Sequence, residues 1–287
     1  EQRRPSNAFE PLGIPTCGWW LPACPKGSVL SKILSSLGEV QFALPFWYQL
    51  ISFVIFGAIW GSFVAALCSR WPIGEQISNG RSRCDACQTT LAPKDLVPIF
   101  SFALLRGKCR YCRQNIGLGA LYTELISAAI GLSAILLVPS EPALAMAVFG
   151  WLLLPLIIMD YQRLWLPNRL VIALAGVGTV GGCFLLPDSI WTDRVIGGAL
   201  GFLSLEAIRQ GFRKIRSEEG MGGGDPKLFG AIGIWLGWQL LPMTLLLACL
   251  IGFAHVATVY VRDRTLPLRL PFGTFLSVAA FLLAAFH

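Results

Sequence analysis

Long apolar stretches alternate with short polar segments along most of this 287-residue chain. A helix needs about 20 consecutive apolar residues to cross the hydrocarbon of a bilayer. By that yardstick the pattern predicts eight membrane-spanning helices, at roughly 46–68, 119–138, 143–159, 170–186, 194–210, 226–241, 242–261 and 271–286. The division between the sixth and seventh spans depends on a turn at Trp238 and Pro242. The predicted fold class is an all-α polytopic membrane protein.

The composition supports this class. Hydrophobic residues make up 55% of the chain and charged residues only 14%, which is more apolar than a soluble core of this size requires. A net charge of +7 is compatible with nucleic-acid binding. The basic residues, however, fall in short loops between apolar spans, as the positive-inside rule predicts. We therefore predict the lipid bilayer, and no nucleic acid, as a partner.

The basic residues also predict an orientation. Eighteen of the 23 lie on one side of the predicted bundle, in segments 70–118, 163–169, 209–227 and 262–269. The positive-inside rule makes this side cytoplasmic and places both chain ends outside. Asp160 and Asp225 then fall together at the cytoplasmic edge of the membrane.

The first 45 residues differ from the rest and are rich in Pro and Gly. Residues 28–39 have helical apolar spacing over a short length, which predicts an amphipathic helix lying in the membrane interface. Cys17 and Cys24 precede it. A disulfide between these thiols, if the segment is periplasmic, and two unpaired cysteines in an irregular tail are equally compatible with the sequence.

Two Cys-x-x-Cys pairs lie in the predicted cytoplasmic loop and are separated by 21 residues. Each pair can turn both thiolates toward one ion, and four thiolates complete the closed tetrahedral shell of structural Zn²⁺. Stable disulfides are disfavoured in the cytoplasm, which favours a metal site over reduced thiols or a redox pair. The predicted ligands are Cys84, Cys87, Cys109 and Cys112.

Asp160 and Asp225 each lie where an apolar span meets a basic loop, and Asp225 follows three glycines. Carboxylates at membrane depth are costly, so such a pair is a candidate functional site. Two adjacent carboxylates share a proton, so that one can activate water while the other protonates a carbonyl oxygen. The structural alternatives are an ion pair of Asp160 with Arg163 and an N-cap role for Asp225.

Several short motifs follow one another in an order that is typical of one family. On them the chain resembles, from about residue 46 to 286, the bacterial type IV prepilin leader peptidase/N-methyltransferase family. The motifs are Gly61-Ser62-Phe63, Arg70-Trp71-Pro72 with Gly74-Glu75, both cysteine pairs, residues 105–109, Asp160 with Leu166-Pro167, residues 220–228, and Pro271-Phe272-Gly273.

The resemblance implies that Asp160 and Asp225 are the catalytic pair of a Gly-x-Gly-Asp intramembrane aspartyl protease, with Gly222, Gly224 and Lys227 in the active-site loop. Such enzymes cut the short basic leader from prepilins and pseudopilins after a glycine, at the cytoplasmic face of the bacterial inner membrane.

Many members then methylate the new N-terminal residue with S-adenosylmethionine, in the first cytoplasmic loop. By position, the candidates for binding this methyl donor are Arg70, Glu75, Gly107 and Lys108, and the alternative is that they are ordinary loop residues.

Two positions depart from the common family pattern. Ala65 replaces an Asn, which bears on methyl transfer, and Asn168 replaces an Asp, which leaves the aspartate pair intact. A peptidase without methyl transfer, whose loop is a structural or substrate-docking zinc module, is therefore an alternative. An ion-coupled transporter is a more distant one, because it predicts mid-membrane carboxylates and an internal repeat.

These features divide the chain into four parts. An N-terminal extension at 1–45 precedes the first transmembrane helix at 46–69. A zinc-ribbon-like cytoplasmic domain of the methyltransferase type follows at 70–118, and a transmembrane aspartyl peptidase domain at 119–287. The sequence predicts no particular oligomeric state.

Overall fold

The computed structural model describes residues 45–74, 104–115, 117–138, 142–185, 191–216, 220–264 and 269–286, together with positions 84, 86, 87, 89, 90, 92 and 102. Apart from isolated bridges, such as the antiparallel one between Lys108 and Asn115, the regular structure of these residues is helical. The predicted interfacial helix at 28–39, Cys17, Cys24 and Glu75 lie outside the described residues.

Each predicted span corresponds to an α-helix, so the all-α class is confirmed. The helices are α2 (Phe46–Arg70), α4 (Leu118–Leu137), α5 (Pro142–Arg163), α6 (Asn168–Leu185), α7 (Trp191–Arg216), α8 (Asp225–Leu236), α9 (Leu241–Asp263) and α10 (Phe272–Phe286). A short 3-10 helix, η1 (Trp71–Ile73), follows α2.

Four of these helices, α2, α4, α5 and α9, are both long and apolar enough to cross a membrane by themselves. Helix α8 is shorter than the predicted span at 226–241, because Gly237 adopts a positive φ of 76° and ends the helix at Leu236. Its 12 residues rise only about 18 Å. The number of membrane crossings therefore stays a prediction.

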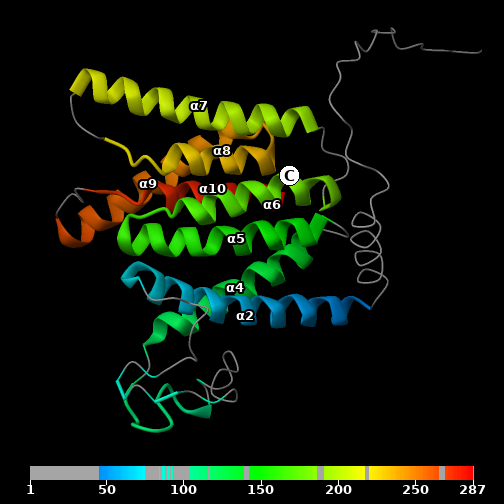
Figure 1. Cartoon of the computed structure of the whole chain (residues 1–287), viewed down its shortest axis with the longest axis vertical. Coiled ribbons are helices and arrows are strands. Elements are labelled where there is room, and N and C mark those ends of the chain that lie inside the picture. The colour runs from blue at the N-terminus through cyan, green and yellow to red at the C-terminus, as the bar shows by residue number, and fades with distance from the viewer. Residues whose placement is uncertain are drawn as a thin grey trace, which may run out of the picture.

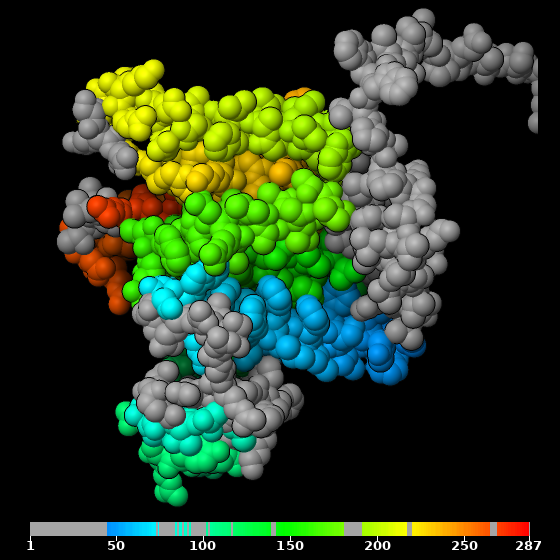
Figure 2. Space-filling model, viewed as in Figure 1, coloured from blue at the N-terminus to red at the C-terminus, as the bar shows by residue number. Residues whose placement is uncertain are grey.

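The helices lie side by side in one bundle (Figure 1), with α7 along one edge and α2 along the other. Helix α2 packs mainly against α4, and α7 mainly against α8, while α10 contacts α5, α8 and α9. The described part of the cysteine segment projects beyond the helices next to the end of α2 (Figure 2). The bundle and this projecting part are thus distinct in space.

Glycines allow the closest helix pairs to approach. Gly57 and Gly61 lie four residues apart on α2, and a Cβ at either position would fall within 2.8 Å of α4 atoms. On α7, Gly197 faces Gly233 of α8 so closely that neither position has room for a side chain. Small residues at such spacing are what lets transmembrane helices pack backbone to backbone.

A proline in α5 leaves a carbonyl that another helix uses. Pro155 has no N–H to donate to the carbonyl four residues earlier, that of Trp151. The Trp60 indole N–H of α2 donates to this carbonyl at 2.9 Å. Pro155 would weaken an isolated helix, but here the carbonyl that it leaves free accepts a hydrogen bond that links α2 to α5.

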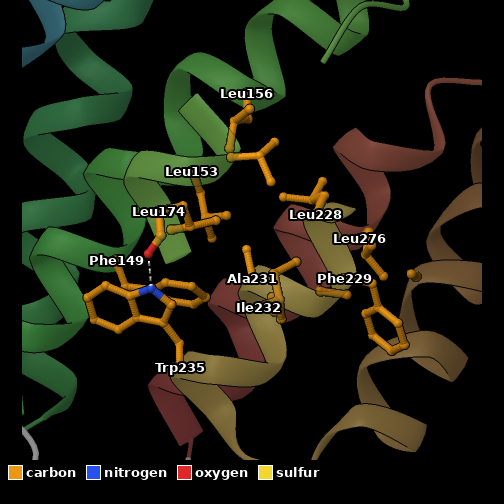
Figure 3. Packing of buried hydrophobic residues seen from close by; sticks show 14 of the residues in the cluster. Phe149, Leu153, Leu156, Leu174, Leu228, Phe229, Ala231, Ile232, Trp235 and Leu276 are labelled. Atoms are coloured by element: carbon orange, nitrogen blue, oxygen red, sulfur yellow. Dashed lines mark hydrogen bonds between the residues drawn. The ribbon is translucent and has the colours of Figure 1, made fainter. Parts of the chain in front are cut away.

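The larger hydrophobic core lies between α5, α6, α8 and α10 (Figure 3). Its tryptophan, Trp235, buries the indole against Phe149 and donates its N–H to the carbonyl of Leu174 at 2.9 Å. Leu156, Leu228 and Leu276 are almost completely buried in the same core. They lie within about one turn of Asp160, Asp225 and Thr274, respectively. This core therefore holds the helix ends that carry those three residues.

Candidate active site

Asp160 and Asp225 both become buried, although they come from different helices. Asp160 lies in the last turn of α5 and is 5% exposed, and Asp225 is the first residue of α8 and is 6% exposed. Among the described residues, no ion pair joins Asp160 to Arg163. The N-cap of α8 is Gly224 rather than Asp225. Neither structural alternative for the aspartates is therefore realised.

Gly273, at the start of α10, lies between the two carboxylates. A Cβ built on it would be 3.1 Å from Asp160 Oδ2 and 3.2 Å from Asp225 Oδ1. Both oxygens therefore lie within a few ångström of one point, and that point is free only because the residue is glycine. Three helices, α5, α8 and α10, meet there.

Thr274, the next residue of α10, hydrogen-bonds to Asp160. Its backbone N–H donates to Asp160 Oδ2 at 2.7 Å, and its hydroxyl lies 3.1 Å from the same oxygen. The hydroxyl is also 3.1 Å from the carbonyl oxygen of Ile157. The sequence argument did not single out Thr274, and the only signal was its place directly after the Pro271-Phe272-Gly273 motif.

The glycine loop before Asp225 is shaped by close contacts. The N–H of Asp225 donates to the carbonyl of Gly222 at 3.4 Å, and a Cβ at Gly222 would lie 3.4 Å from Asp225 Oδ2. A Cβ at Gly224 would approach the Leu166 side chain to 2.8 Å, and one at Gly273 would approach it to 2.9 Å. Leu166 thus lies against the glycines that surround the carboxylates.

Lys227, the other predicted loop residue, bonds to the start of α6. Its ammonium donates to Asn168 Oδ1 at 3.0 Å, and both residues are exposed. This bond links the first turn of α8 to the first residue of α6. The Asn at position 168 therefore has a partner, which sequence reasoning did not predict.

The four predicted metal ligands come together. All four sulfur atoms lie within 4.8 Å of one another, and Cys84 Sγ and Cys112 Sγ are 3.8 Å apart. Zn–S bonds of about 2.3 Å in a tetrahedron place sulfurs roughly 3.8 Å apart, so the donor set and its spacing fit Zn²⁺. With four thiolates the shell is closed, which is typical of a structural and not a catalytic ion.

Local hydrogen bonds lower the pKa of two of these thiols. Hydrogen bonds from the side chain and backbone of Thr89 lower the pKa of Cys87 to about 6, and the backbone N–H groups of Cys112 and Tyr111 lower the pKa of Cys109. Despite a backbone hydrogen bond at Gln114, desolvation and the neighbouring thiols raise the pKa of Cys112 to about 11. Thiolates this close repel one another unless a cation lies between them.

The described residues among the methyl-donor candidates come from two parts of the chain, the end of α2 and the cysteine segment. Arg70 is the last residue of α2, and Lys108 is an exposed residue of the cysteine segment. Gly107 has a clear structural reason: its φ is +69°, and a Cβ there would lie 2.8 Å from the ring of Phe102. The fourth candidate, Glu75, lies outside the described residues.

Known families match both halves of this arrangement. Residues 55–138, which include the four cysteines, match the bacterial peptidase A24 N-terminal domain. Residues 147–257, which include both aspartates, match the type IV leader peptidase family. The chain belongs to this family.

Curated relatives cover most of the chain. A protein from Burkholderia pseudomallei is 35% identical over 265 residues, which is 82% of this chain and 84% of the relative. Proteins from Aeromonas hydrophila and Pseudomonas aeruginosa are each 34% identical and cover 70% of both chains. All three are named prepilin leader peptidase/N-methyltransferase. No solved structure matches the chain.

The region that matches the leader peptidase family includes the two aspartates but not the α10 residues that contact them. The matched family region ends at residue 257, before Gly273 and Thr274. The aspartates therefore lie within the matched region, whereas the residues that join them in space follow it. The contact of these two residues with the aspartates is visible only in the three-dimensional arrangement.

Proposed function

We propose that this protein is a membrane aspartyl endopeptidase that removes the basic leader of type IV prepilins or pseudopilins after a glycine and then N-methylates the new N-terminal residue. The observation that carries the proposal is the convergence of Asp160 and Asp225 beside Gly273. The names of the relatives agree with it. Family membership favours neither the peptidase-only alternative nor the transporter.

The proposed chemistry uses the two carboxylates in different protonation states. Like charges so close, with so little exposure, cannot both ionise, so the pair holds one proton. The ionised carboxylate takes a proton from water, whose oxygen attacks the carbonyl carbon of the scissile bond. The protonated carboxyl donates to the developing oxyanion. Collapse of the tetrahedral intermediate then breaks the C–N bond. The carboxyl that took the water proton gives it to the leaving amine, and the other carboxylate takes back the proton it had given to the oxyanion.

The surroundings of the pair suit a glycine before the cut. Gly222 and Gly224 precede Asp225, and Gly273 lies between the carboxylates. Leu166 packs against Gly224 and Gly273. Glycines let a substrate backbone approach closely. A substrate residue without a Cβ fits beside such a crowded point more readily than a larger one. We include Gly222 and Gly224 in the active-site loop on this basis, and Lys227 because it follows Asp225 by two residues.

For the cysteine segment we propose one structural Zn²⁺, held by Cys84, Cys87, Cys109 and Cys112. The ion would supply folding free energy to a small domain at 70–118. We place the methyl donor, S-adenosylmethionine, in this domain, with Arg70, Glu75, Gly107 and Lys108 as candidate residues. Gly107 would contribute to this domain through the turn that its positive φ allows.

For the membrane arrangement we propose eight crossings in the bacterial inner membrane, with the active site at the cytoplasmic face. Helix α8 would be completed by the turn that follows it. Trp238 in that turn donates to Asp193 of α7 at 3.2 Å, and Arg209 of α7 lies near Gly223 at the other end of α8. The 16 residues between 193 and 209 rise roughly 24 Å, close to the hydrocarbon thickness.

Reconstitution with a prepilin that carries a glycine at its processing site tests the peptidase. We expect Asp160→Asn and Asp225→Asn each to lower the cleavage rate roughly a thousandfold, because each removes one partner in proton transfer. Asp263→Asn, at the exposed end of α9, is the matched control and should cleave like the wild type. Normal cleavage by either active-site variant would refute the assignment.

Methyl transfer is tested in the same preparation with a radiolabelled methyl donor. Label in the mature pilin supports the bifunctional enzyme. Full cleavage with no label would leave the peptidase alone, with the cysteine domain as a structural or docking module. In that case, methylation by Ala65→Asn would show whether the alanine at this position is the cause of the missing methyl transfer.

A further inference from the structure

Thr274 makes hydrogen bonds that distinguish the two carboxylates from each other. Asp160 Oδ2 accepts the Thr274 backbone N–H at 2.7 Å and lies 3.1 Å from its hydroxyl. Among the described residues, Asp225 makes no comparable side-chain contact, and its neighbours are the Gly222 backbone and Gly273. The environment of the pair is therefore asymmetric.

The start of α10 explains why this N–H is available. The first N–H groups of a helix have no acceptor within the helix, and Thr274 is the third residue of α10. Asp160 supplies the missing acceptor from α5. Thr274 is 8% exposed, so water does not compete freely for these bonds.

We infer that Thr274 is a positioning residue that keeps Asp160 ionised and oriented, so that Asp160 is the base toward water and Asp225 carries the shared proton. This rests on the proposed peptidase function and assigns roles within it. Hydrogen bonds to the ionised form of a carboxyl favour that form. With Oδ2 occupied by Thr274, Oδ1 remains to accept the proton of the attacking water.

The Thr274 hydroxyl has a single proton and two acceptors at equal distance, Asp160 Oδ2 and the Ile157 carbonyl. While Asp160 is ionised, the hydroxyl can donate to it. Once Asp160 has taken a proton on Oδ1, its negative charge is lost and the hydroxyl can donate to the Ile157 carbonyl instead. Rotation of one hydroxyl thus serves both states of the base without moving a backbone atom. Among the described residues, the titratable group that faces Asp160 from the packed elements is Asp225, and α10 brings Gly273 and Thr274.

Thr274→Val and Thr274→Ser form the matched pair that tests this inference. Valine keeps the shape and the backbone N–H but loses the hydroxyl, and serine keeps both donors. We expect valine to lower kcat for prepilin cleavage roughly tenfold to a hundredfold with little change in KM. Serine should retain most of the activity.

The pH dependence adds a readout that a merely structural role would not move. Loss of the hydroxyl disfavours the ionised base, so the acidic limb of the rate profile should move to higher pH by about one unit in Thr274→Val. The basic limb should stay in place. An unchanged profile in Thr274→Val, or a serine variant as defective as the valine variant, would overturn the inference.

Carbodiimide labelling separates this inference from the proposed function, because it needs no substrate. Carbodiimides react with protonated carboxyls, and mass spectrometry reports modification at Asp160 as pH is lowered. Labelling should begin at higher pH in Thr274→Val than in the wild type. Identical labelling curves overturn the role of Thr274 even if the wild type cleaves, and a wild type that fails to cleave overturns only the peptidase. If the valine variant is poorly folded, Thr274→Ala provides the same comparison.

Discussion

At the scale of single residues, the site depends on the absence of a side chain at position 273. The two carboxylate oxygens and Leu166 all approach the point that a Cβ would occupy. Glycine is needed here for space and not for an unusual backbone, since its φ is not in the left-handed region.

Gly273→Ala should therefore impair catalysis more than stability. The methyl group would push apart carboxylates that must act together, and a misplacement of about 1 Å can cost roughly a hundredfold in rate. Prepilin cleavage and thermal unfolding in detergent, measured together, check this. Gly176→Ala on α6 has open space around its Cβ and is the control. Equal activity of the two variants would contradict the proposed geometry.

Residue identity alone predicted only part of the candidate active site. The aspartates were found because carboxylates next to apolar spans are rare and costly. The four cysteines were found because their spacing is typical of zinc knuckles. Thr274 is an ordinary residue beside a motif, and its bond to Asp160 joins positions 114 residues apart. No local pattern reports such a contact.

At the scale of elements, the position of Asp225 depends on how closely α7 and α8 approach. Helix α8 has only 12 residues, and α7 runs along it through a glycine seam at Gly197, Gly201 and Gly233. Because α8 is so short, its position depends on packing against neighbouring helices. The seam therefore helps to hold the first turn of α8, where Asp225 lies.

Gly197→Val should separate this helix pair. A side chain at Gly197 would collide with the backbone of Gly233, and overpacking of this kind costs about 1–3 kcal/mol. We expect a lower unfolding temperature in detergent and reduced cleavage. Gly211→Ala, on the same helix with nothing near its Cβ, should leave both unchanged or raise stability slightly. If the two variants behave alike, the seam is not needed.

The spans themselves followed from apolar length, but their ends did not. The prediction placed a helix at 226–241, whereas α8 ends at Leu236 because Gly237 takes a positive φ. It also placed one at 194–210, whereas α7 extends over 191–216 into charged residues. Hydropathy marks where lipid can surround a helix, and it does not mark where backbone hydrogen bonding continues beyond the lipid.

At the scale of the whole molecule, the described part of the cysteine segment lies beyond the helix bundle that carries the two aspartates (Figure 2). In the described residues, an edge-to-face contact joins Trp71, just after α2, to Trp165, next to the active-site residue Leu166, with ring centroids 6.1 Å apart. The peptidase core instead lies between α5, α6, α8 and α10. The two proposed activities should therefore be separable.

Metal removal should reveal this separation. We expect metal analysis of protein purified without chelator to find about one zinc per chain. Cys109→Ser should lose the ion and methyl transfer because the segment loses its main source of folding free energy. Helical content by circular dichroism and prepilin cleavage should stay within a few-fold of the wild type. Cys249→Ser, outside the cluster, should retain metal and both activities. A fully folded metal-free segment would contradict the zinc proposal.

The sequence by itself determined the all-α class, the approximate place of the eight helices, both aspartates and the cysteine cluster. These are local properties, because a helix satisfies its backbone within one apolar segment and a Cys-x-x-Cys pair forms within one turn. Only the tertiary structure decided that α10 brings Gly273 and Thr274 to the carboxylates and that Lys227 bonds to Asn168. Those outcomes depend on which helices pack together, and packing is set by contacts between residues far apart in the chain.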